Sequence, residues 1–327
     1  MSHLGLRRAA STRQHFLRDV LDGLQGEPKS LPSKYFYDTR GSRLFDAICR
    51  LDEYYLTRTE LAIMREHAAE MVECLGGRCV LIEYGSGSSL KTQMLLERLK
   101  PGSSYVPIDI SERHLEQSAA RIARKYPAIQ VNPVSADFTS TLELPDLAGD
   151  GDRRAIYFPG STIGNFEPAA AVRLLKQIRS LIGPDGGLLI GVDLRKPRDI
   201  LEPAYNDARG ITARFNLNLL RRINRELGAD FDLEAFEHSA FFNADEGRIE
   251  MHLVSVVDQT VHVQGRSIPF CRDETIHTEN SYKHTLRGFA QLAASAGLSV
   301  ERVWCDAGGL FSVQYLAPHG GGGILSH

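Results

Sequence analysis

A buried strand that leads through a glycine-rich turn into a helix is the sequence feature that most limits the fold of this chain. Residues 79–83 form a continuous apolar run ended by a carboxylate, as expected of a strand buried on both faces of a parallel sheet. The turn over 84–89 contains Gly85 and Gly87, and a helical pattern follows over about 90–99. A missing side chain lets a ligand approach the backbone closely. The order strand, turn, helix therefore predicts a ligand site at the end of this strand.

Strand and helix patterns alternate along the rest of the chain after about residue 60. A helical pattern over 61–75 precedes the first strand, and Ser111 and Pro168 begin two further helices. Other strands are expected at 104–109, 129–134, 154–158 and 188–192. A helix over 286–296 and strands over 299–304 and 311–316 would complete the sheet. Repeated strand-helix units predict an α/β fold with a Rossmann-like, doubly wound parallel sheet.

The pattern changes between residues 196 and 285. A long helical segment over 213–227 is followed by partial alternation over 248–257, which predicts an inserted α+β unit. The first sixty residues are helical and polar-aromatic, and we expect them to join the insertion as a cap over the carboxyl edge of the sheet. We therefore predict two domains. The sheet domain comprises 61–195 plus 286–327, and the second lobe comprises 1–60 plus 196–285.

The charge balance and the apolar runs exclude several classes of protein. The chain has 327 residues with 38 Lys and Arg against 41 Asp and Glu, a formal net charge of -3. No strong field attracts nucleic acid or an anionic membrane. The longest apolar runs, such as 187–192, fall far short of the roughly 20 residues that a membrane helix needs. The N-terminus has basic residues without an apolar signal core, so we expect a cytoplasmic protein.

Cysteine and histidine positions give no indication of a disulfide framework or a metal centre. The five cysteines contain no Cys-x-x-Cys pair, and we expect them to be reduced thiols of the core. The eleven histidines are scattered without a His-Glu-x-x-His helix or comparable spacing. We therefore expect no metal.

The residues after the next two strands indicate a nucleoside ligand. Asp109 ends the second strand roughly 20 residues after the glycines, where a carboxylate can accept hydrogen bonds from ribose hydroxyls. A solvated strand-end Asp is the alternative interpretation. Leu90 stands where a dinucleotide fingerprint needs Gly or Ala, and no phosphate-binding lysine motif occurs, so a ligand without a pyrophosphate fits better. Asp137 and Phe138 suit the amino edge and face of an adenine, although a loop Asp beside a core Phe explains them equally well.

The segment 83–89, with Asp109 and Asp137-Phe138, resembles the class I S-adenosylmethionine-dependent methyltransferases. More narrowly, the chain resembles the histidine-specific methyltransferases of ergothioneine biosynthesis from about residue 31 to residue 283. The motifs that carry this resemblance follow the family's order and lie at 34–42, 53–60, 159–166, 205–207, 215–218 and 278–281. The resemblance implies a class I methyltransferase domain for the sheet and a substrate-binding lobe for the insertion.

The resemblance also implies the roles of individual residues. S-adenosylmethionine would be the cofactor, contacted by Gly85, Gly87, Lys91, Asp109, Asp137 and Phe138. Asn165 and Tyr205 would hold the substrate's α-amino and carboxylate groups. Met251, Glu279 and Ser281 would face its imidazole. Tyr55, Gly160 and Phe215 would complete the substrate site. These amide, phenol, carboxylate and hydroxyl groups supply the donors and acceptors that such a substrate needs.

The implied activity is three successive methylations of the α-amino group of free L-histidine, which give hercynine. The amine must be neutral to attack. A site of Asn and Tyr offers an ammonium little compensation, so we expect no dedicated strong base. Tyr37 or a water would carry the proton away, and Asn165 and Gly160 would leave room for the growing ammonium. We expect a monomer whose partners are histidine and its mono- and dimethyl forms.

Three other functions remain open at this point. The same chemistry on another amino acid, such as tryptophan, differs at Met251, Glu279 and Ser281, because an indole has one N–H donor and no ring acceptor. A nicotinamide-dependent oxidoreductase is disfavoured by Leu90. A nonenzymatic cofactor-binding regulator would bind S-adenosylmethionine without turnover.

Overall fold

The computed structural model describes residues 3–87, 90–140 and 153–320. By its internal contacts the chain divides into two compact units, each made of two chain segments. Unit 1 comprises Met1–Tyr54 and Pro197–Asn280, and unit 2 comprises Tyr55–Lys196 and Ser281–His327. These divisions fall within a few residues of the predicted domain borders. Ser88 and Ser89 of the glycine-rich turn lie outside the described residues.

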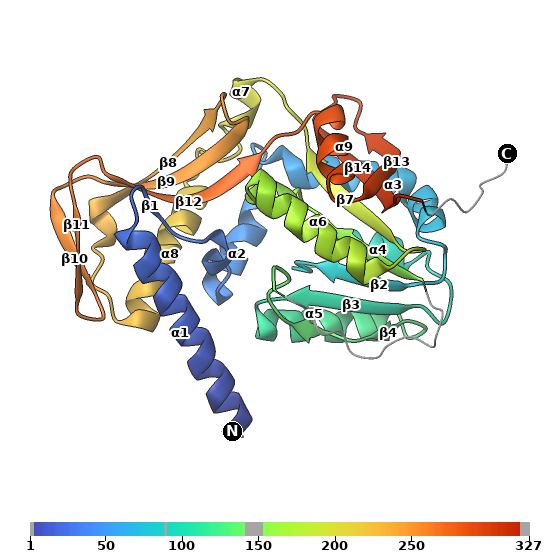
Figure 1. The fold of residues 1–327 in the computed structure, drawn as a ribbon, viewed down its shortest axis with the longest axis horizontal. Helices are drawn as coiled ribbons and strands as arrows, with labels where there is room; N and C mark the ends of the chain where they lie inside the picture. The colour runs from blue at the N-terminus through green and yellow to red at the C-terminus, as the bar shows by residue number, and fades with distance from the viewer. Residues whose placement is uncertain (1–2, 88–89, 141–152, 321–327) are drawn as a thin grey trace. The chain divides into compact units, whose positions relative to one another are not determined.

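Unit 2 contains a doubly wound sheet, which confirms the predicted fold class (Figure 1). The strands lie in the order β13-β14-β7-β6-β2-β3-β4, and β5 also pairs with β3. Pairing is parallel from β7 through β4, whereas β14 is antiparallel to both of its neighbours. The bounds are β2 (Val80–Tyr84), β3 (Ser104–Asp109), β4 (Gln130–Val131), β5 (Val134–Ser135), β6 (Arg154–Phe158), β7 (Gly187–Asp193), β13 (Leu298–Cys305) and β14 (Phe311–Pro318).

This strand order places a topological switch point at β2. The chain proceeds outward from β2 to β3 and β4, then returns to β6 and β7 on the other side of β2. Ligands of open α/β sheets bind at the carboxyl ends of the strands where the order reverses. The turn after β2 and the loop after β6 are therefore the expected places for a ligand.

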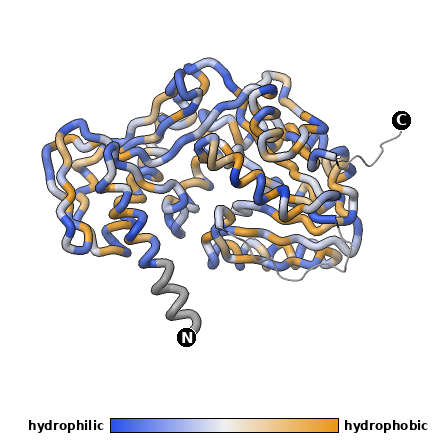
Figure 2. The backbone as a smooth tube through the Cα atoms, in the orientation of Figure 1, coloured by the Kyte–Doolittle hydropathy of each residue, from blue (hydrophilic) through white to orange (hydrophobic). Residues whose placement is uncertain are grey.

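The helices of unit 2 follow the predicted pattern with shifted ends. They are α3 (Tyr55–Cys74), α4 (Leu90–Leu96), α5 (Glu112–Lys125), η2 (Thr162–Asn165), α6 (Pro168–Ile182) and α9 (Leu286–Ala294). The predicted strand over 129–134 is wrong as one element, because Asn132-Pro133 separates β4 from β5 and proline cannot donate to a ladder. The predicted helix over 90–99 ends at Leu96. Figure 2 shows how hydrophobic residues follow the central strands, whose side chains pack against α6 and α9.

Unit 1 combines helices with a small sheet of order β1-β12-β9-β8 and a separate β10–β11 hairpin. Its elements are α1 (His3–Gln25), β1 (Lys29–Ser30), η1 (Ser33–Phe36), α2 (Thr39–Ile48), α7 (Arg198–Leu201), α8 (Ile211–Leu227), η3 (Leu233–Ala235), β8 (Phe236–Asn243), β9 (Arg248–Ser255), β10 (Gln259–Val263), β11 (Arg266–Phe270) and β12 (Thr275–Tyr282). The last two residues of β12 belong to unit 2.

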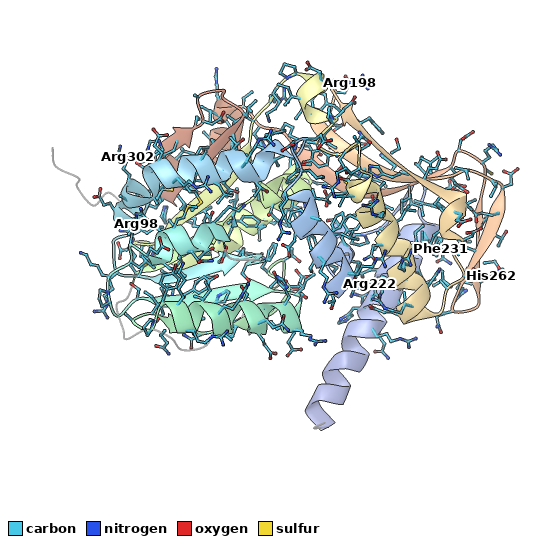
Figure 3. All side chains as sticks on the ribbon, turned by 180° about the vertical axis from the view of Figure 1, so that it is seen from behind. Arg98, Arg198, Arg222, Phe231, His262 and Arg302 are labelled. Carbon is cyan, nitrogen blue, oxygen red and sulfur yellow. The ribbon has the colours of Figure 1, made fainter. Side chains whose placement is uncertain are left out.

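The long helix α8 organises unit 1. It starts at Ile211, two residues before the predicted start, because the Asp207 carboxylate accepts the Ile211 and Thr212 N–H groups at 2.8 and 2.7 Å. The Arg222 guanidinium on α8 (Figure 3) lies over the Phe16 ring, 5.0 Å from its centroid, and donates to the Tyr35 carbonyl at 2.9 Å. These contacts fasten α1 and η1 to α8.

The expectation that the cysteines are core thiols is wrong for most of them. Cys79 is buried, Cys49 and Cys74 are partly exposed, and Cys271 and Cys305 are exposed. Cys305 ends the edge strand β13, and Cys271 follows β11 in a turn, so neither position faces a core. No described helix has the length and apolar character needed to cross a membrane.

Candidate active site

The glycine turn and Asp109 lie against each other at the carboxyl ends of β2 and β3. Gly85 and Gly87 have φ values of 70° and 44°, a left-handed region that side chains rarely adopt. The Gly87 N–H donates to Asp109 Oδ2 at 3.3 Å, and the Ser111 N–H donates to Oδ1 at 2.9 Å. Among the residues that the structure describes, the atom nearest to a Cβ at Gly87 would be the Gly85 carbonyl oxygen at 4.0 Å. The turn thus presents an open backbone surface beside a carboxylate, which fits a nucleoside.

Phe138 borders the same turn. Its ring stacks on Tyr84 with centroids 5.1 Å apart and meets the edge of Phe158 at 5.5 Å. A Cβ at Gly85 would lie 4.0 Å from Phe138 Cε1. Asp137 Oδ1 accepts from the Thr139 N–H at 2.9 Å and from its hydroxyl at 2.5 Å. Phe138 is therefore a packed aromatic that borders the glycine turn, and the adenine contact of the Asp-Phe pair stays a prediction.

Glu60 joins Lys91 to the loop that follows β6. Its carboxylate is fully buried, forms an ion pair with Lys91, and accepts the Gly160 N–H at 3.0 Å. A Cβ at Gly191 would lie 2.5 Å from Glu60 Oε1, so this carboxylate also needs glycine on β7. Gly160 itself has a φ of 76°. The backbone conformation, more than space beside it, requires glycine at 160, because a Cβ there would make only ordinary contacts, the nearest at 3.6 Å from Lys91 Nζ.

A second buried group of charges, the Asp193 network, consists of Tyr55, Asp193, Lys196, Ser281 and Lys283. The Tyr55 hydroxyl donates to Asp193 Oδ2 at 2.7 Å and accepts from Lys196 Nζ at 2.8 Å. Lys196 and Lys283 contact the two Asp193 oxygens at 2.5 and 2.7 Å, and Lys283 Nζ donates to Ser281 Oγ at 2.7 Å. Two ammonium groups thus share one carboxylate, which gives the network a formal excess of one positive charge.

Burial and this surplus of positive charge together lower the pKa of Lys196. Burial lowers its pKa to about 8, and the like charge of Lys283 acts in the same direction, while Asp193 opposes both. A buried cation with so low a pKa costs little to deprotonate near neutral pH. Lys196 is therefore a group that can exchange a proton in the working range of an enzyme.

The loop that carries Asn165 packs directly on this network. Ser161 has a left-handed φ of 58°, and its hydroxyl accepts the Asp193 N–H at 2.9 Å. A Cβ at Gly164 would lie 2.9 Å from the Tyr282 carbonyl oxygen, so the loop lies close against the end of β12. Asn165 ends η2 and is partly exposed. The sequence thus holds Asn165 on a rigid turn at the carboxyl edge of the sheet.

Unit 1 contains an aromatic cluster, which consists of Tyr37, Phe45, Tyr54, Tyr205 and Phe215. Three of its members, Tyr37, Tyr205 and Phe215, are predicted site residues. Tyr37 meets Phe45 and Phe215 at centroid distances of 5.6 and 5.7 Å, and Phe45 meets Tyr54 at 6.3 Å. Tyr54 in turn lies 6.2 Å from Tyr205. Burial raises the pKa of Tyr54 well above its ordinary value, and the nearby hydroxyls and the Glu279 carboxylate add to the shift. The cluster therefore has Glu279 within electrostatic range.

The remaining imidazole residues occupy different units. Met251 is buried on β9, and its carbonyl accepts the Thr278 hydroxyl at 3.0 Å. Glu279 belongs to unit 1, whereas Ser281 belongs to unit 2 and is bonded to Lys283. The imidazole roles of all three residues stay predictions.

Four residues of these networks were not predicted from the sequence: Glu60, Asp193, Lys196 and Lys283. The sequence predicts no carboxylate base at the substrate amine, whereas buried carboxylates lie beside Gly160 and Tyr55, two residues proposed for the substrate site. Asp193 ends β7 as Asp109 ends β3, so its place at a strand end was an available signal. Lys283 gave none, because nothing local in the sequence places the residue after β12 next to Asp193. The sequence predicts a substrate contact for Tyr55 but no role for the adjacent Tyr54.

Glu83 on β2 is a fully buried carboxyl that contacts two hydroxyl groups. It is hydrogen-bonded to Thr92 and Tyr105, and burial raises its pKa to about 8. The folded protein thus holds a proton on Glu83 at neutral pH. Its position beneath the glycine turn makes this proton part of the turn's support.

We expect Glu83→Gln to remove a pH dependence of stability. The folded-state pKa lies above the unfolded value of 4.5, so the folded state binds the proton more tightly and stability falls as pH rises from about 4.5 to 8. The neutral amide has no such slope. Urea unfolding between pH 5 and 8 measures the difference in unfolding free energy between wild type and variant. Parallel pH profiles would contradict the assignment.

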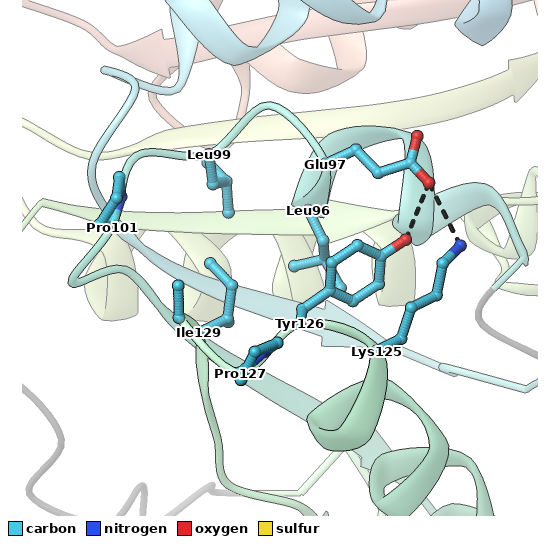
Figure 4. Close-up of a pocket in the computed structure, with 9 residues that line it drawn as sticks. Leu96, Glu97, Leu99, Pro101, Lys125, Tyr126, Pro127 and Ile129 are labelled. Carbon is cyan, nitrogen blue, oxygen red and sulfur yellow. Dashed lines mark hydrogen bonds and ion pairs between the residues drawn. The ribbon is translucent and has the colours of Figure 1, made fainter.

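A surface hollow in unit 2 lies away from these groups (Figure 4). It is lined by residues 96–101 and 125–129, which precede β3 and β4 and so mark the amino ends of the strands. Tyr126 and Lys125 donate to Glu97 at 2.9 and 3.2 Å on its rim. Ligands of such sheets bind at the carboxyl ends. We therefore assign the ligand site to the glycine turn rather than to this hollow.

The strand order, the glycine turn and the contact of Gly87 with Asp109 together define a class I methyltransferase. The chain belongs to the family of S-adenosylmethionine-dependent, histidine-specific methyltransferases, whose model matches residues 16–318. It is 42% identical to the histidine N-alpha-methyltransferase of Mycolicibacterium smegmatis over 94% of this chain and 96% of that protein. The enzyme of the same name from Mycobacterium tuberculosis is also 42% identical, over 96% of this chain and 95% of its own. Ergothioneine biosynthesis protein 1 of Neurospora crassa is 30% identical over 85% of this chain but only 32% of its own length.

Proposed function

We propose that this chain transfers methyl groups from S-adenosylmethionine to the α-amino group of free L-histidine, three times in succession, to give hercynine for ergothioneine biosynthesis. The observation that carries the proposal is the pairing of a nucleoside-binding turn, where Gly87 meets Asp109, with the buried Asp193 network in a chain of this family. The histidine N-alpha-methyltransferase relatives match almost the whole chain, which supports the choice of substrate.

Residues of unit 2 would hold the cofactor. Asp109 would accept the ribose hydroxyls, the open backbone of Gly85 and Gly87 would border the cofactor, and Asp137 with Phe138 would meet its adenine. Lys91 would act from its ion pair with Glu60. Bound S-adenosylmethionine supplies an electrophilic methyl group on a sulfonium, and the protein's part is to align the nucleophile.

The proposal assigns residues of both units to histidine. Asn165 and Tyr205 would bind its α-amino and carboxylate groups, with Tyr55, Gly160 and Phe215 contributing to the same site. Met251, Glu279 and Ser281 would meet the imidazole. Glu279 can accept a ring N–H, and Ser281 can pair with the other ring nitrogen. A site built from such groups rejects side chains that leave its polar atoms unpaired.

The Asp193 network offers a way to make the substrate amine neutral. The Tyr55 hydroxyl donates a hydrogen bond to Asp193, so its oxygen acts as an acceptor toward its other partners. The surplus positive charge of Lys196 and Lys283 disfavours an ammonium beside Tyr55 and lowers the pKa of the bound amine. Lys196 supplies this charge while it is protonated, below its pKa of about 8, so a water would carry the amine's proton away. Tyr37 remains the proposed alternative carrier.

Mass analysis after incubation with S-adenosylmethionine and a panel of free amino acids tests the function. We expect three methyl additions to histidine, through the mono- and dimethyl forms, and none to other amino acids. Methylation of tryptophan without histidine would refute the imidazole assignment. Tight cofactor binding without turnover on any amino acid would favour the regulator instead.

We expect Glu279→Ala to lower kcat/KM for histidine about 10- to 100-fold, as for the loss of a hydrogen bond to a charged group. Discrimination against tryptophan should fall at the same time, because the variant has no partly buried carboxylate that an indole fails to pair. Steady-state kinetics with both amino acids give the measurement. Glu237→Ala, at an exposed position of β8, is the control and should behave as wild type. Equal losses with both amino acids would contradict a role in specificity.

We further propose a monomer that works in the cytoplasm. The exposed free thiols of Cys271 and Cys305 suit a reducing compartment. The near-balanced charge favours no polyanionic partner. Light scattering coupled to size exclusion measures the mass against the 36.3 kDa of one chain.

A further inference from the structure

Glu250, His252 and His277 form a cluster of ligand-type side chains on the sheet of unit 1. Glu250 and His252 lie two residues apart on β9, so they project from the same face, and His277 lies on the adjacent strand β12. One ligand atom of each residue lies within 4.8 Å of the others. Glu250 is buried, and the two imidazoles are partly buried.

The spacing of these atoms is close to that of a metal site. Glu250 Oε2 and His252 Nε2 are 3.1 Å apart. Two donors bound to one tetrahedral ion at about 2.1 Å are about 3.4 Å apart. A movement of about 1.5 Å or less therefore brings the ligand atoms to binding distance. The His252 and His277 rings stack with centroids 4.8 Å apart, so the His277 ring must turn to aim a nitrogen at a shared ion.

Neighbouring groups orient the Glu250 carboxylate. Arg248 Nε and Asn243 Nδ2 both donate to Glu250 Oε1, at 2.8 and 2.9 Å, which leaves Oε2 turned toward His252.

Second contacts also orient the imidazoles. His277 Nε2 lies 3.2 Å from the Glu279 carbonyl, and a proton on that nitrogen leaves Nδ1 as the free ligand. His252 Nδ1 is buried and has no hydrogen-bond partner among the described residues. Phe241 stacks on the other face of His252 at 5.3 Å and shields it from water. A carboxylate oxygen beside an imidazole nitrogen, with a second imidazole on the adjacent strand, is an arrangement that a bound cation would explain.

We propose that Glu250, His252 and His277 bind a divalent transition-metal ion. Two imidazoles with one carboxylate suit zinc, cobalt or nickel, whereas calcium and magnesium prefer oxygen ligands throughout. The guanidinium of Arg248 repels a cation, so the affinity is moderate. The sequence did not predict this site, because a Glu-x-His pair on a strand lacks the ligand spacing of a His-Glu-x-x-His helix. The site is independent of the methyl-transfer proposal.

Isothermal titration of tag-free protein with Zn²⁺, and visible absorption with Co²⁺, test this site. Cys271→Ser and Cys305→Ser should be present throughout, because exposed thiols also bind these ions. We expect one equivalent to bind. Affinity should fall at least about tenfold in His252→Ala, His277→Ala and Glu250→Gln, as for loss of a ligand. His262→Ala, at an exposed histidine paired with Asp230, is the matched control and should bind as the parent protein does.

Two results would overturn the proposal. One is the absence of a stoichiometric equivalent in the parent protein, which needs no folded variant. The other is unchanged binding in both histidine variants. A Co²⁺ spectrum that lacks the d–d bands of imidazole-bound Co²⁺ would also contradict the site. A Zn²⁺-dependent rise in Tm that His252→Ala abolishes would support it.

Discussion

Replacing Lys196 with methionine is expected to reduce kcat for histidine methylation about 10- to 100-fold at pH 7.5. One unit charge about 5 Å from the bound amine, at an effective dielectric constant near 20, interacts with an ammonium by about 3 kcal/mol and so shifts the amine pKa by about 2 units. Lys196 destabilises the ammonium form, so its removal raises the amine pKa and leaves less neutral nucleophile. Asp193 keeps Lys283 as its counter-ion in the variant, so the core does not gain an uncompensated carboxylate.

The pH profile of kcat separates this role from a structural one. The higher kcat of the wild type over Lys196→Met should disappear above pH 8, where Lys196 itself loses its proton. The kcat profiles of the two proteins should therefore converge near pH 9.5. Lys196→Arg, which keeps the charge, should recover part of the activity at pH 7.5. Lys176→Met, at an exposed lysine of α6, is the control. A pH-independent loss in Lys196→Met, or a pH shift found only in Tyr37→Phe, would assign proton removal elsewhere.

Asp109→Ala should weaken cofactor binding about 10- to 100-fold, the second large effect that the structure predicts. The carboxylate lies beside the glycine turn, and each hydrogen bond from a ribose hydroxyl to a charged acceptor contributes about 1.5–3 kcal/mol. Asp109→Asn keeps one acceptor oxygen and should lie between the two. Calorimetric titration with S-adenosylmethionine gives Kd directly.

Thermal melts guard against an indirect effect, because Asp109 also holds the Ser111 N–H at the start of α5. Asp185→Ala, at an exposed position before β7, should change neither Kd nor Tm. An unchanged Kd in Asp109→Ala would remove this residue from the cofactor site and weaken the case for the glycine turn.

The sheet could be predicted because its determinants are local. Apolar runs such as 79–83, glycine turns and the cap at Pro168 each report a boundary within a few residues. The short strands β4 and β5 were misjudged because Pro133 interrupts a run that otherwise reads as one strand. The helix α8 was placed two residues late because the capping Asp207 lies before its glycine.

The charge networks were predicted poorly because they depend on contacts distant in sequence. Glu60 meets Gly160 across 100 residues, and Tyr55 meets Asp193 across 138. Such pairs have no periodic signal, and only the end of strand β7 hinted at Asp193. The family resemblance predicts three members of the aromatic cluster, Tyr37, Tyr205 and Phe215. Tyr54, which links them, looks like an ordinary core residue in the sequence.

The position of β14 has a consequence for the order in which the protein can fold during synthesis. This strand, Phe311–Pro318, is the last described element of the chain, yet it lies inside the sheet between β7 and β13. A nascent chain released only as far as residue 305 exposes the unpaired edge of β7, which can recruit other chains. The ribosome must therefore deliver residue 318 before the sheet can close, and a premature stop between the end of β13 and the end of β14 should yield an aggregating product rather than a shortened enzyme.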